Sequence, residues 1–448
     1  MTLLNKPLAH EAVEDSNTSN NIEFQTIINR RMHRRHILKG GTGLAAAAFF
    51  GALPLVGCSD DDDDSPSRLP SDDDQAAIPA QGNLKRPDTL KFTAVAHSTA
   101  DTISVAEGYQ AEMILPLGTP LMSGIADWKD NREQSAESFE WRMGDNHDGM
   151  WFFGKKGNTY DAKASKNGLL VMNHEYVNSS ELSPFGYHVI SDNNAAPIYQ
   201  NRRLASDVRR EVNCHGVAVV EMTRRADGMG YEMVKDSKYN RRITSSTPAQ
   251  LTGPVAGSDL VKTKFDSTGL QTRGINNNCG AGLSPWGTYL TTEENFLGVF
   301  ARGQDAEQLS AAHNYGRERY GASENFSGWE YLWHTPYAKD EIIADEFVRW
   351  DMTATGADAT EDYRNGFNTF GYITEIDPFD RHSAPQKRTA LGRFAHENCA
   401  YAPVESGKPV VFYMGDDARG EYIYKFVSKA RWSLSLIHIS EPTRLLSI

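Results

Sequence analysis

Short apolar runs of strand length recur along most of this chain, and each is bounded by Gly, Pro, Asn or Asp. The clearest are residues 168–172, 216–222, 287–292, 370–376, 409–414 and 421–426. Runs of about four to eight residues with such boundaries predict β-strands. Long helical periodicity is scarce, and the polar segment 301–312 is the best helical candidate. We therefore expect residues 90–432 to form an all-β domain, either a propeller or a large sandwich.

Length, charge and cysteine content limit the class of protein. With 448 residues the chain can hold two ordinary domains or one large all-β domain. Its formal net charge of −13 argues against nucleic-acid binding. The four cysteines are Cys58, Cys214, Cys279 and Cys399. They have neither CxxC spacing nor the density of a disulfide framework, so each needs its own explanation.

The N-terminal residues predict an export signal. Arg34 and Arg35 stand just ahead of the apolar run 44–56, which is typical of the twin-arginine route. The run is too short and too rich in Gly and Ala for a membrane span, which needs about 20 apolar residues. We therefore expect residues 1–57 to be a cleaved signal and the twin-arginine export machinery to be a partner. That route carries folded proteins, often with the metal already installed.

Cys58 ends a Leu-Val-Gly-Cys sequence that is similar to the lipobox of bacterial lipoproteins. Lipidation of Cys58 would anchor the protein to a membrane; the alternative is a buried cysteine near a cleavage site. The next residues are the aspartate run 60–64 and a Ser/Pro/Asp-rich stretch. Their negative charges repel one another, and they lack the hydrophobic residues that a packed core needs. Residues 58–89 are therefore expected to be a disordered acidic tether. The predicted location is periplasmic or at the cell surface.

The last sixteen residues, 433–448, do not continue the strand pattern. They resemble a translated sequencing-adapter tail more than a natural C-terminus. We therefore expect a non-native tail and a β-domain that is incomplete at its C-terminal end.

Two polar clusters follow directly on predicted strands, where functional groups of all-β enzymes tend to lie. Asn173-His174-Glu175 offers hard oxygen ligands and an imidazole, and Glu293-Glu294 places two carboxylates side by side. Two adjacent negative charges near a protein interior are unfavourable without a cation. A metal site is the functional interpretation of both clusters, and a solvated turn is the alternative.

Two further clusters carry other chemistry. Cys214-His215 stands just before a strongly apolar strand, where a thiolate beside an imidazole would serve as a nucleophile or as a ligand to a transition metal. The alternative is a buried, inert cysteine. In the segment 416–421, between two predicted strands, Arg419 could grip a phosphate bidentately while Glu421 binds metal. An ordinary hairpin turn is the alternative there.

Two weaker signals complete the candidates. Residues 145–148 are rich in oxygen ligands and suit calcium, although they lack the spacing of an EF-hand loop. Glu107 is a lone carboxylate at a predicted strand start and does not indicate a function by itself.

Taken together, these segments resemble the PhoX family of alkaline phosphatases, which are bacterial enzymes exported by the twin-arginine route. The resemblance extends over residues 106–428 and rests on segments 107–109, 173–178, 214–221, 285–296, 392–397 and 414–426. Several motifs in the same order make the resemblance specific. Family members usually continue well beyond the end of the present chain.

The resemblance implies a six-bladed β-propeller that carries iron and calcium and hydrolyses phosphate monoesters. By position, it implies metal ligation by Glu107, Asn173, Glu175, Cys214, Glu293 or Glu294, and Glu421. Arg419, Cys214 and Glu175 are the implied catalytic residues, with Arg419 holding the substrate phosphate. The softer sulfur of Cys214 suits iron, and carboxylates can bridge iron and calcium.

Some roles stay open at this level. The sequence does not choose between Glu293 and Glu294, and it assigns no role to His174, His215 or Glu397. Cys279 and Cys399 are expected to be small buried residues rather than ligands.

Two other functions use the same features. A metal-dependent phosphodiesterase or lactonase would keep the propeller and the metals, because a fold alone does not fix the reaction. A calcium-stabilised surface propeller that binds a partner or a polysaccharide would have no catalysis. Arg419 favours phosphate over lactone, and Cys214 argues against a purely calcium-binding scaffold, which needs no thiolate.

The lipobox generates one prediction. Cys58→Ala removes the only atom that can be lipidated in that sequence, so the exported protein is expected to move from the membrane fraction to the soluble fraction. Cell fractionation followed by immunoblotting measures the change. Unchanged membrane retention of the variant would rule out Cys58 as the anchor.

Overall fold

A computed structural model describes residues 93–184, 186–329, 331–336, 342 and 345–433, together with the backbone of residues 442–447. The described residues belong to one compact unit, Thr93–Ser447. The predicted export signal, Cys58 and the acidic tether lie outside them. Among the described residues, no helix has the length and apolar character needed to cross a membrane.

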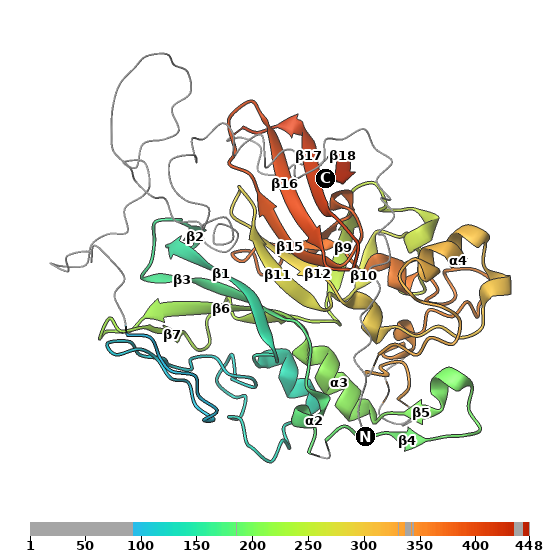
Figure 1. The fold of residues 1–448 in the computed structure, drawn as a ribbon, viewed down its shortest axis with the longest axis horizontal. Coiled ribbons are helices and arrows are strands. Elements are labelled where there is room, and N and C mark those ends of the chain that lie inside the picture. The colour runs from blue at the N-terminus through green and yellow to red at the C-terminus, as the bar shows by residue number, and fades with distance from the viewer. Residues whose placement is uncertain are drawn as a thin grey trace, which may run out of the picture. The chain divides into compact units, whose positions relative to one another are not determined.

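The first of three larger sheets is antiparallel and has the order β2-β1-β3-β6-β7, with β8 paired to β6 (Figure 1). Its strands are β1 (His147–Lys156), β2 (Thr159–Tyr160), β3 (Asn167–His174), β6 (Gly216–Arg224), β7 (Tyr231–Met233) and β8 (Arg241–Ile243). β3 and β6 are buried along most of their length. Burial on both faces explains why both strands read as continuous apolar runs rather than as alternating ones.

The second sheet has the order β10-β9-β14-β13-β12-β11. Its strands are β9 (Pro248–Thr252), β10 (Gln271–Arg273), β11 (Asn278–Leu283), β12 (Tyr289–Glu293), β13 (Ile373–Ile376) and β14 (Gln386–Arg388). β14 and β9 pair in parallel, and the other neighbours are antiparallel. β12 is buried at every position.

The third sheet has the order β15-β16-β17-β18 and is antiparallel. Its strands are β15 (His396–Tyr401), β16 (Pro409–Asp416), β17 (Ile423–Arg431) and β18 (Pro442–Ser447). β18 lies within the C-terminal tail, so the strand pattern continues further than the sequence suggested. Figure 1 shows this sheet, in red, beside β11 and β12, in yellow.

The remaining elements are short. A two-stranded sheet is formed by β4 (Ile190–Ser191) and β5 (Asn201–Arg202), and the α-helices are α2 (Ser179–Leu182), α3 (Ala205–Cys214) and α4 (Ala311–Glu318). The 3-10 helices are η2 (Ala136–Trp141), η3 (Pro197–Tyr199), η4 (Asp259–Val261), η5 (Phe296–Val299), η6 (Ala306–Gln308), η7 (Val348–Trp350), η8 (Gly366–Thr369) and η9 (Thr389–Leu391).

The prediction of a mainly β fold is confirmed, and each of the six predicted strand segments contains a strand. The predicted helix at 301–312 begins later, as η6 and α4. Ala301 and Arg302 instead form bridges to Asp351 and Phe326. Ser310 Oγ then accepts the His313 N–H and caps α4. The described residues hold three larger sheets, and the six blades that the resemblance implied stay a prediction.

Strands from all three sheets approach closely where β1, β11 and β15 meet. A Cβ atom added to Gly280 in β11 would lie 1.9 Å from the Glu397 carbonyl oxygen, and one added to Gly149 in β1 would lie 2.6 Å from Ala281 N. Neither position can hold a side chain without moving backbone, because real Cβ atoms do not approach backbone so closely. Glycine therefore lets the three sheets converge at this junction.

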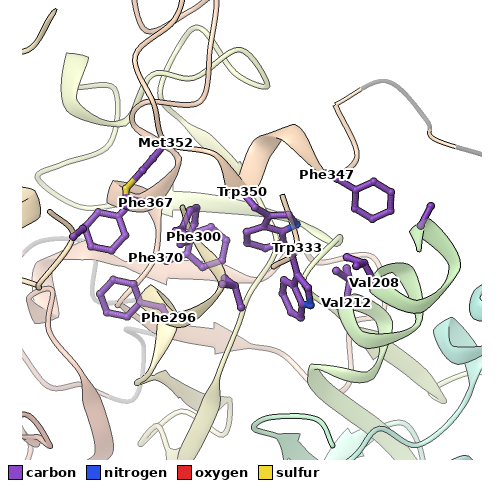
Figure 2. Close-up of a cluster of buried hydrophobic side chains, with 13 residues drawn as sticks. Val208, Val212, Phe296, Phe300, Trp333, Phe347, Trp350, Met352, Phe367 and Phe370 are labelled. Carbon is purple, nitrogen blue, oxygen red and sulfur yellow. The ribbon is translucent and has the colours of Figure 1, made fainter. Parts of the chain in front are cut away.

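A large hydrophobic cluster fixes the helical and irregular segments beside the second sheet (Figure 2). It combines side chains of α3 with aromatic side chains from segments 296–300, 333–352 and 367–370. Trp333 and Trp350 are fully buried, with ring centroids 5.1 Å apart. Trp333 Nε1–H also donates to Glu211 Oε2 at 2.8 Å. Aromatic packing therefore replaces regular secondary structure as the support of this region.

The cluster generates a stability prediction. Trp333→Ala leaves a cavity and removes one hydrogen bond to Glu211, and is expected to lower the free energy of unfolding by about 3–5 kcal/mol. Chemical denaturation measures the change. Tyr315→Ala, at an α4 side chain that is 70% exposed, is the control and is expected to change stability by about 0.5 kcal/mol or less. Equal effects of the two substitutions would contradict this assignment of the core.

Candidate metal centre

Four carboxylates and one thiol converge at the junction of the three sheets. Asp148, Glu175 and Cys279 form one group, and Cys279, Glu294 and Glu397 form a second. Within each group the potential ligand atoms all lie within 4.8 Å of one another. Because Cys279 belongs to both groups, its sulfur is the centre of the arrangement.

Three of these residues stand on irregularities of the strand pairing. Asp148 and Gly149 of β1 lie opposite Asn173 alone, and Cys279 and Gly280 of β11 lie opposite Thr292 alone. Glu397 is an extra residue in the pairing of β15 with β16. A β-bulge turns a side chain away from its regular direction and is frequent beside active sites. Here the bulges aim Asp148, Cys279 and Glu397 at one place.

Glu175 and Glu294 reach the same place from strand ends. Glu175 follows β3 directly, and Glu294 follows β12. The Glu175 N–H donates to the Asn146 carbonyl, and the Glu294 N–H donates to the Asn277 carbonyl, each at 3.1 Å. These backbone hydrogen bonds fix both residues as they leave the sheet.

The thiol of Cys279 lies among carboxylate oxygens. Its Sγ is 3.0 Å from Asp148 Oδ2 and 3.5 Å from Glu397 Oε2. Burial raises the pKa of this thiol strongly, and its hydrogen bond to Asp148 and the charge of Glu294 add to the shift. A cation bound here would reverse that balance, because metal binding deprotonates a coordinating thiol.

Two of the carboxylates, Glu175 and Glu294, resist ionisation. The pKa of Glu294 is raised to about 8, first by burial and then by the nearby Glu397. Burial, followed by Asp148 and Glu397, raises the pKa of Glu175. Like charges this close in a half-buried place are unfavourable unless a cation compensates them. The donor set therefore fits a site with hard oxygen ligands and one soft sulfur ligand, as a mixed centre of a transition metal and a hard cation requires.

The loop between β16 and β17 borders the group on the Glu294 side, since Asp417 shares a side-chain hydrogen bond with Glu294. Arg419 is exposed in this loop. Glu421 is in the same loop, but its carboxylate pairs with Arg319, which caps α4, and it is not a member of either group. Arg419 thus lies in the loop that borders the group and is exposed to solvent.

The structure separates the two neighbouring glutamates of β12. Glu293 is fully buried and accepts hydrogen bonds from Lys387 Nζ at 2.8 Å and from the backbone N–H groups of Asn276, Gly371 and Tyr372. Burial raises its pKa, and the Lys387 ammonium opposes that rise. Glu294, not Glu293, reaches the candidate centre.

Three other residues implied by the resemblance lie outside the group. Cys214 ends α3 and is fully buried in a hydrophobic cluster with Phe139, Val177 and Leu182. Burial raises the pKa of its thiol well above the usual value. Glu107 is exposed in the segment that precedes β1. Asn173 is fully buried, and hydrogen bonds within the protein engage both ends of its amide.

Sequence reasoning missed three members of the group. Asp148 stands in the oxygen-rich segment 145–148, and Glu397 stands in one of the segments that carry the family resemblance. Both therefore had a signal, although neither was assigned as a ligand. Cys279 was expected to be a small buried residue. The direction of the Cys279 side chain depends on a bulge, and nothing in the sequence of this strand predicts that bulge.

Comparison with known proteins shows the family to which this chain belongs. The family model that matches this mostly β chain, over residues 90–436, is described as alkaline phosphatase PhoX. The chain belongs to the PhoX alkaline phosphatase family. No curated protein matches it.

A solved structure supports the family assignment. The chain is similar to Pseudomonas fluorescens PhoX, solved in complex with vanadate, a transition-state analogue, with 36% sequence identity and a TM-score of 0.62. The match covers 77% of this chain and 52% of that one. The present chain therefore spans about half the length of the relative that it matches.

The buried Glu293–Lys387 pair generates a prediction. Lys387→Met removes the buried cation and leaves Glu293 without its charged partner, so the free energy of unfolding is expected to fall by about 3–5 kcal/mol. The double variant Lys387→Met/Glu293→Gln removes both charges and is expected to recover part of that loss. Denaturation of the three proteins gives the values. A double variant less stable than the single one would contradict the charge-pair account.

Proposed function

We propose that this chain forms the metal-binding part of an alkaline phosphatase that hydrolyses phosphate monoesters and releases inorganic phosphate. One observation carries the proposal. In a chain of the PhoX family, four carboxylates and one thiol form two groups, and within each group the potential ligand atoms lie within 4.8 Å of one another. Asp148, Glu175, Cys279, Glu294 and Glu397 would hold the metals. This set replaces the ligands that the sequence resemblance implied at Cys214, Glu107 and Asn173.

We propose iron and calcium as the metals. The thiolate of Cys279 is a soft ligand that suits iron, and the surrounding carboxylates supply the oxygen atoms that calcium prefers. When bound, such a centre supplies positive charge that polarises phosphoryl oxygens and stabilises the charge of the transition state. Asp148 and Glu397 flank the sulfur, so they would hold the metals together with Cys279.

Arg419 would bind the phosphate group. Its guanidinium is exposed in the loop that borders Glu294, and guanidinium groups bind phosphate bidentately. The Arg319–Glu421 ion pair ties this loop to the end of α4 and thereby limits the positions that Arg419 can take. The site therefore favours a phosphate ester over a lactone. A neutral lactone has no anionic oxygen for a guanidinium to bind.

The wider setting is part of the same proposal. We propose that the three larger sheets, two of six strands and one of four, form part of a β-propeller, the fold that the family resemblance implied. We also propose that the enzyme is exported by the twin-arginine route and anchored through Cys58, on the strength of the N-terminal motifs. Phosphate esters outside the cytoplasm would be its substrates.

Substitution of Cys279 and of Cys214 tests which of these two sulfur atoms binds the metal. Cys279→Ala removes the central ligand, so bound iron is expected to be lost and phosphate release from a chromogenic monoester to fall by at least about 100-fold. Cys214→Ala is expected to keep its iron, because that thiol packs among hydrophobic side chains. Metal analysis by mass spectrometry and a phosphate-release assay give both values.

Cys399→Ala is the matched control, because Cys399 is also buried but packs in the core of the third sheet. It is expected to keep wild-type iron content. Loss of iron from Cys214→Ala together with its retention by Cys279→Ala would contradict the proposed centre. Hydrolysis of phosphodiesters faster than monoesters by the wild-type protein would contradict the proposed substrate.

A further inference from the structure

The bulge that carries Cys279 is held by a side chain from a different sheet. The ladder between β11 and β12 is interrupted at Cys279 and Gly280. Asn173 of β3 reaches across and donates from Nδ2 to the Cys279 carbonyl at 2.6 Å and to the Gly280 carbonyl at 2.8 Å. The carbonyl groups of both bulge residues are therefore satisfied by one amide.

The orientation of that amide is fixed from its other end. Asn173 Oδ1 accepts hydrogen bonds from the Tyr289 hydroxyl at 2.8 Å and the Thr291 hydroxyl at 2.9 Å. A reversed amide would place Oδ1 against two carbonyl oxygens, which are acceptors only. Both ends of the side chain are thus engaged within the protein, and no lone pair is directed to a cation.

The same network reaches the other two bulges. The Tyr289 hydroxyl also lies 2.8 Å from the Gly149 carbonyl, next to Asp148 in the bulge of β1. The Thr292 hydroxyl lies 3.2 Å from the Gly280 carbonyl and 3.4 Å from the Glu397 carbonyl. Asn173, Tyr289 and Thr292 are all buried. Contacts of these three buried side chains therefore connect the three bulges that carry Asp148, Cys279 and Glu397.

We propose that Asn173 and Tyr289 are positioning residues that set the direction of the Cys279 thiol, and that Asn173 is not itself a metal ligand. This inference rests on the proposed metal centre. Its physical basis is that a bulge lacks ladder hydrogen bonds, so its side-chain direction depends on whatever else holds its backbone. Outer hydrogen bonds that orient ligands typically change metal affinity by about 10–100-fold.

Cobalt(II) is a suitable probe, because a thiolate bound to cobalt gives a charge-transfer absorption that reports on Cys279 independently of catalysis. Tyr289→Phe removes one hydroxyl and keeps the ring. It is expected to weaken cobalt binding by about 10–100-fold and to reduce the charge-transfer band. Asn173→Leu keeps the approximate volume, removes the amide and is expected to have the same effect or a larger one.

Tyr239→Phe is the matched control. Tyr239 is buried in the same hydrophobic cluster as Tyr289, and its hydroxyl is 3.1 Å from Asn158 Oδ1, away from the bulges. It is expected to bind cobalt as the wild-type protein does. If the Tyr289 hydroxyl only stabilised the fold, Tyr289→Phe and Tyr239→Phe would change cobalt binding to the same extent.

Three results would overturn the inference. Wild-type cobalt affinity and absorption in Tyr289→Phe would show that the network does not position the thiol, and this test holds even if Asn173→Leu fails to fold. Lost affinity in Asn173→Leu alone, with Tyr289→Phe unchanged, would indicate that Asn173 is a direct ligand. Absence of a thiolate band in the wild-type protein would instead remove the metal centre itself, and the inference with it.

Discussion

Three β-bulges at the junction of three sheets are the constraint on which the rest of this structure depends. A regular strand sends successive side chains to opposite faces, so one extra residue in a strand re-aims its neighbour. The bulges at Asp148, Cys279 and Glu397 do this in β1, β11 and β15. Glycine at positions 149 and 280 lets the backbones come close enough for the re-aimed side chains to meet.

The junction concentrates negative charge, and the surrounding core compensates only part of it. Glu293 receives a buried lysine and three backbone N–H groups, which makes it a structural part of the second sheet. The next residue, Glu294, has carboxylate neighbours and a raised pKa instead. These neighbouring residues at the end of β12 thus have different roles, because Glu293 meets a protein cation whereas Glu294 meets other carboxylates. The side of Glu294 is therefore the one that suits a metal.

The sequence predicted the family and the mainly β fold better than it predicted which residues form the candidate centre. Strand runs and family motifs predicted the mainly β fold, and carboxylates at strand ends pointed to Glu175 and to the Glu293–Glu294 pair. Choosing Cys279 over Cys214 as the candidate ligand requires knowing the direction in which each side chain points. Cys214 sits beside a histidine in the sequence but faces a hydrophobic cluster at the end of α3, whereas a bulge turns Cys279 toward carboxylates. Hydrogen bonds between sheets, such as those of Asn173, are also absent from local sequence pattern.

The position of the bound metal tests this account most directly. Crystals of the iron-loaded protein, measured at the iron absorption edge, would give an anomalous difference peak at each iron atom. We expect a peak within bonding distance of Cys279 Sγ, about 2.3 Å for a metal–sulfur bond, with oxygen atoms of Glu294 or Glu397 beside it. A peak bonded to Cys214, or iron bound without any contact to Cys279, would contradict the account.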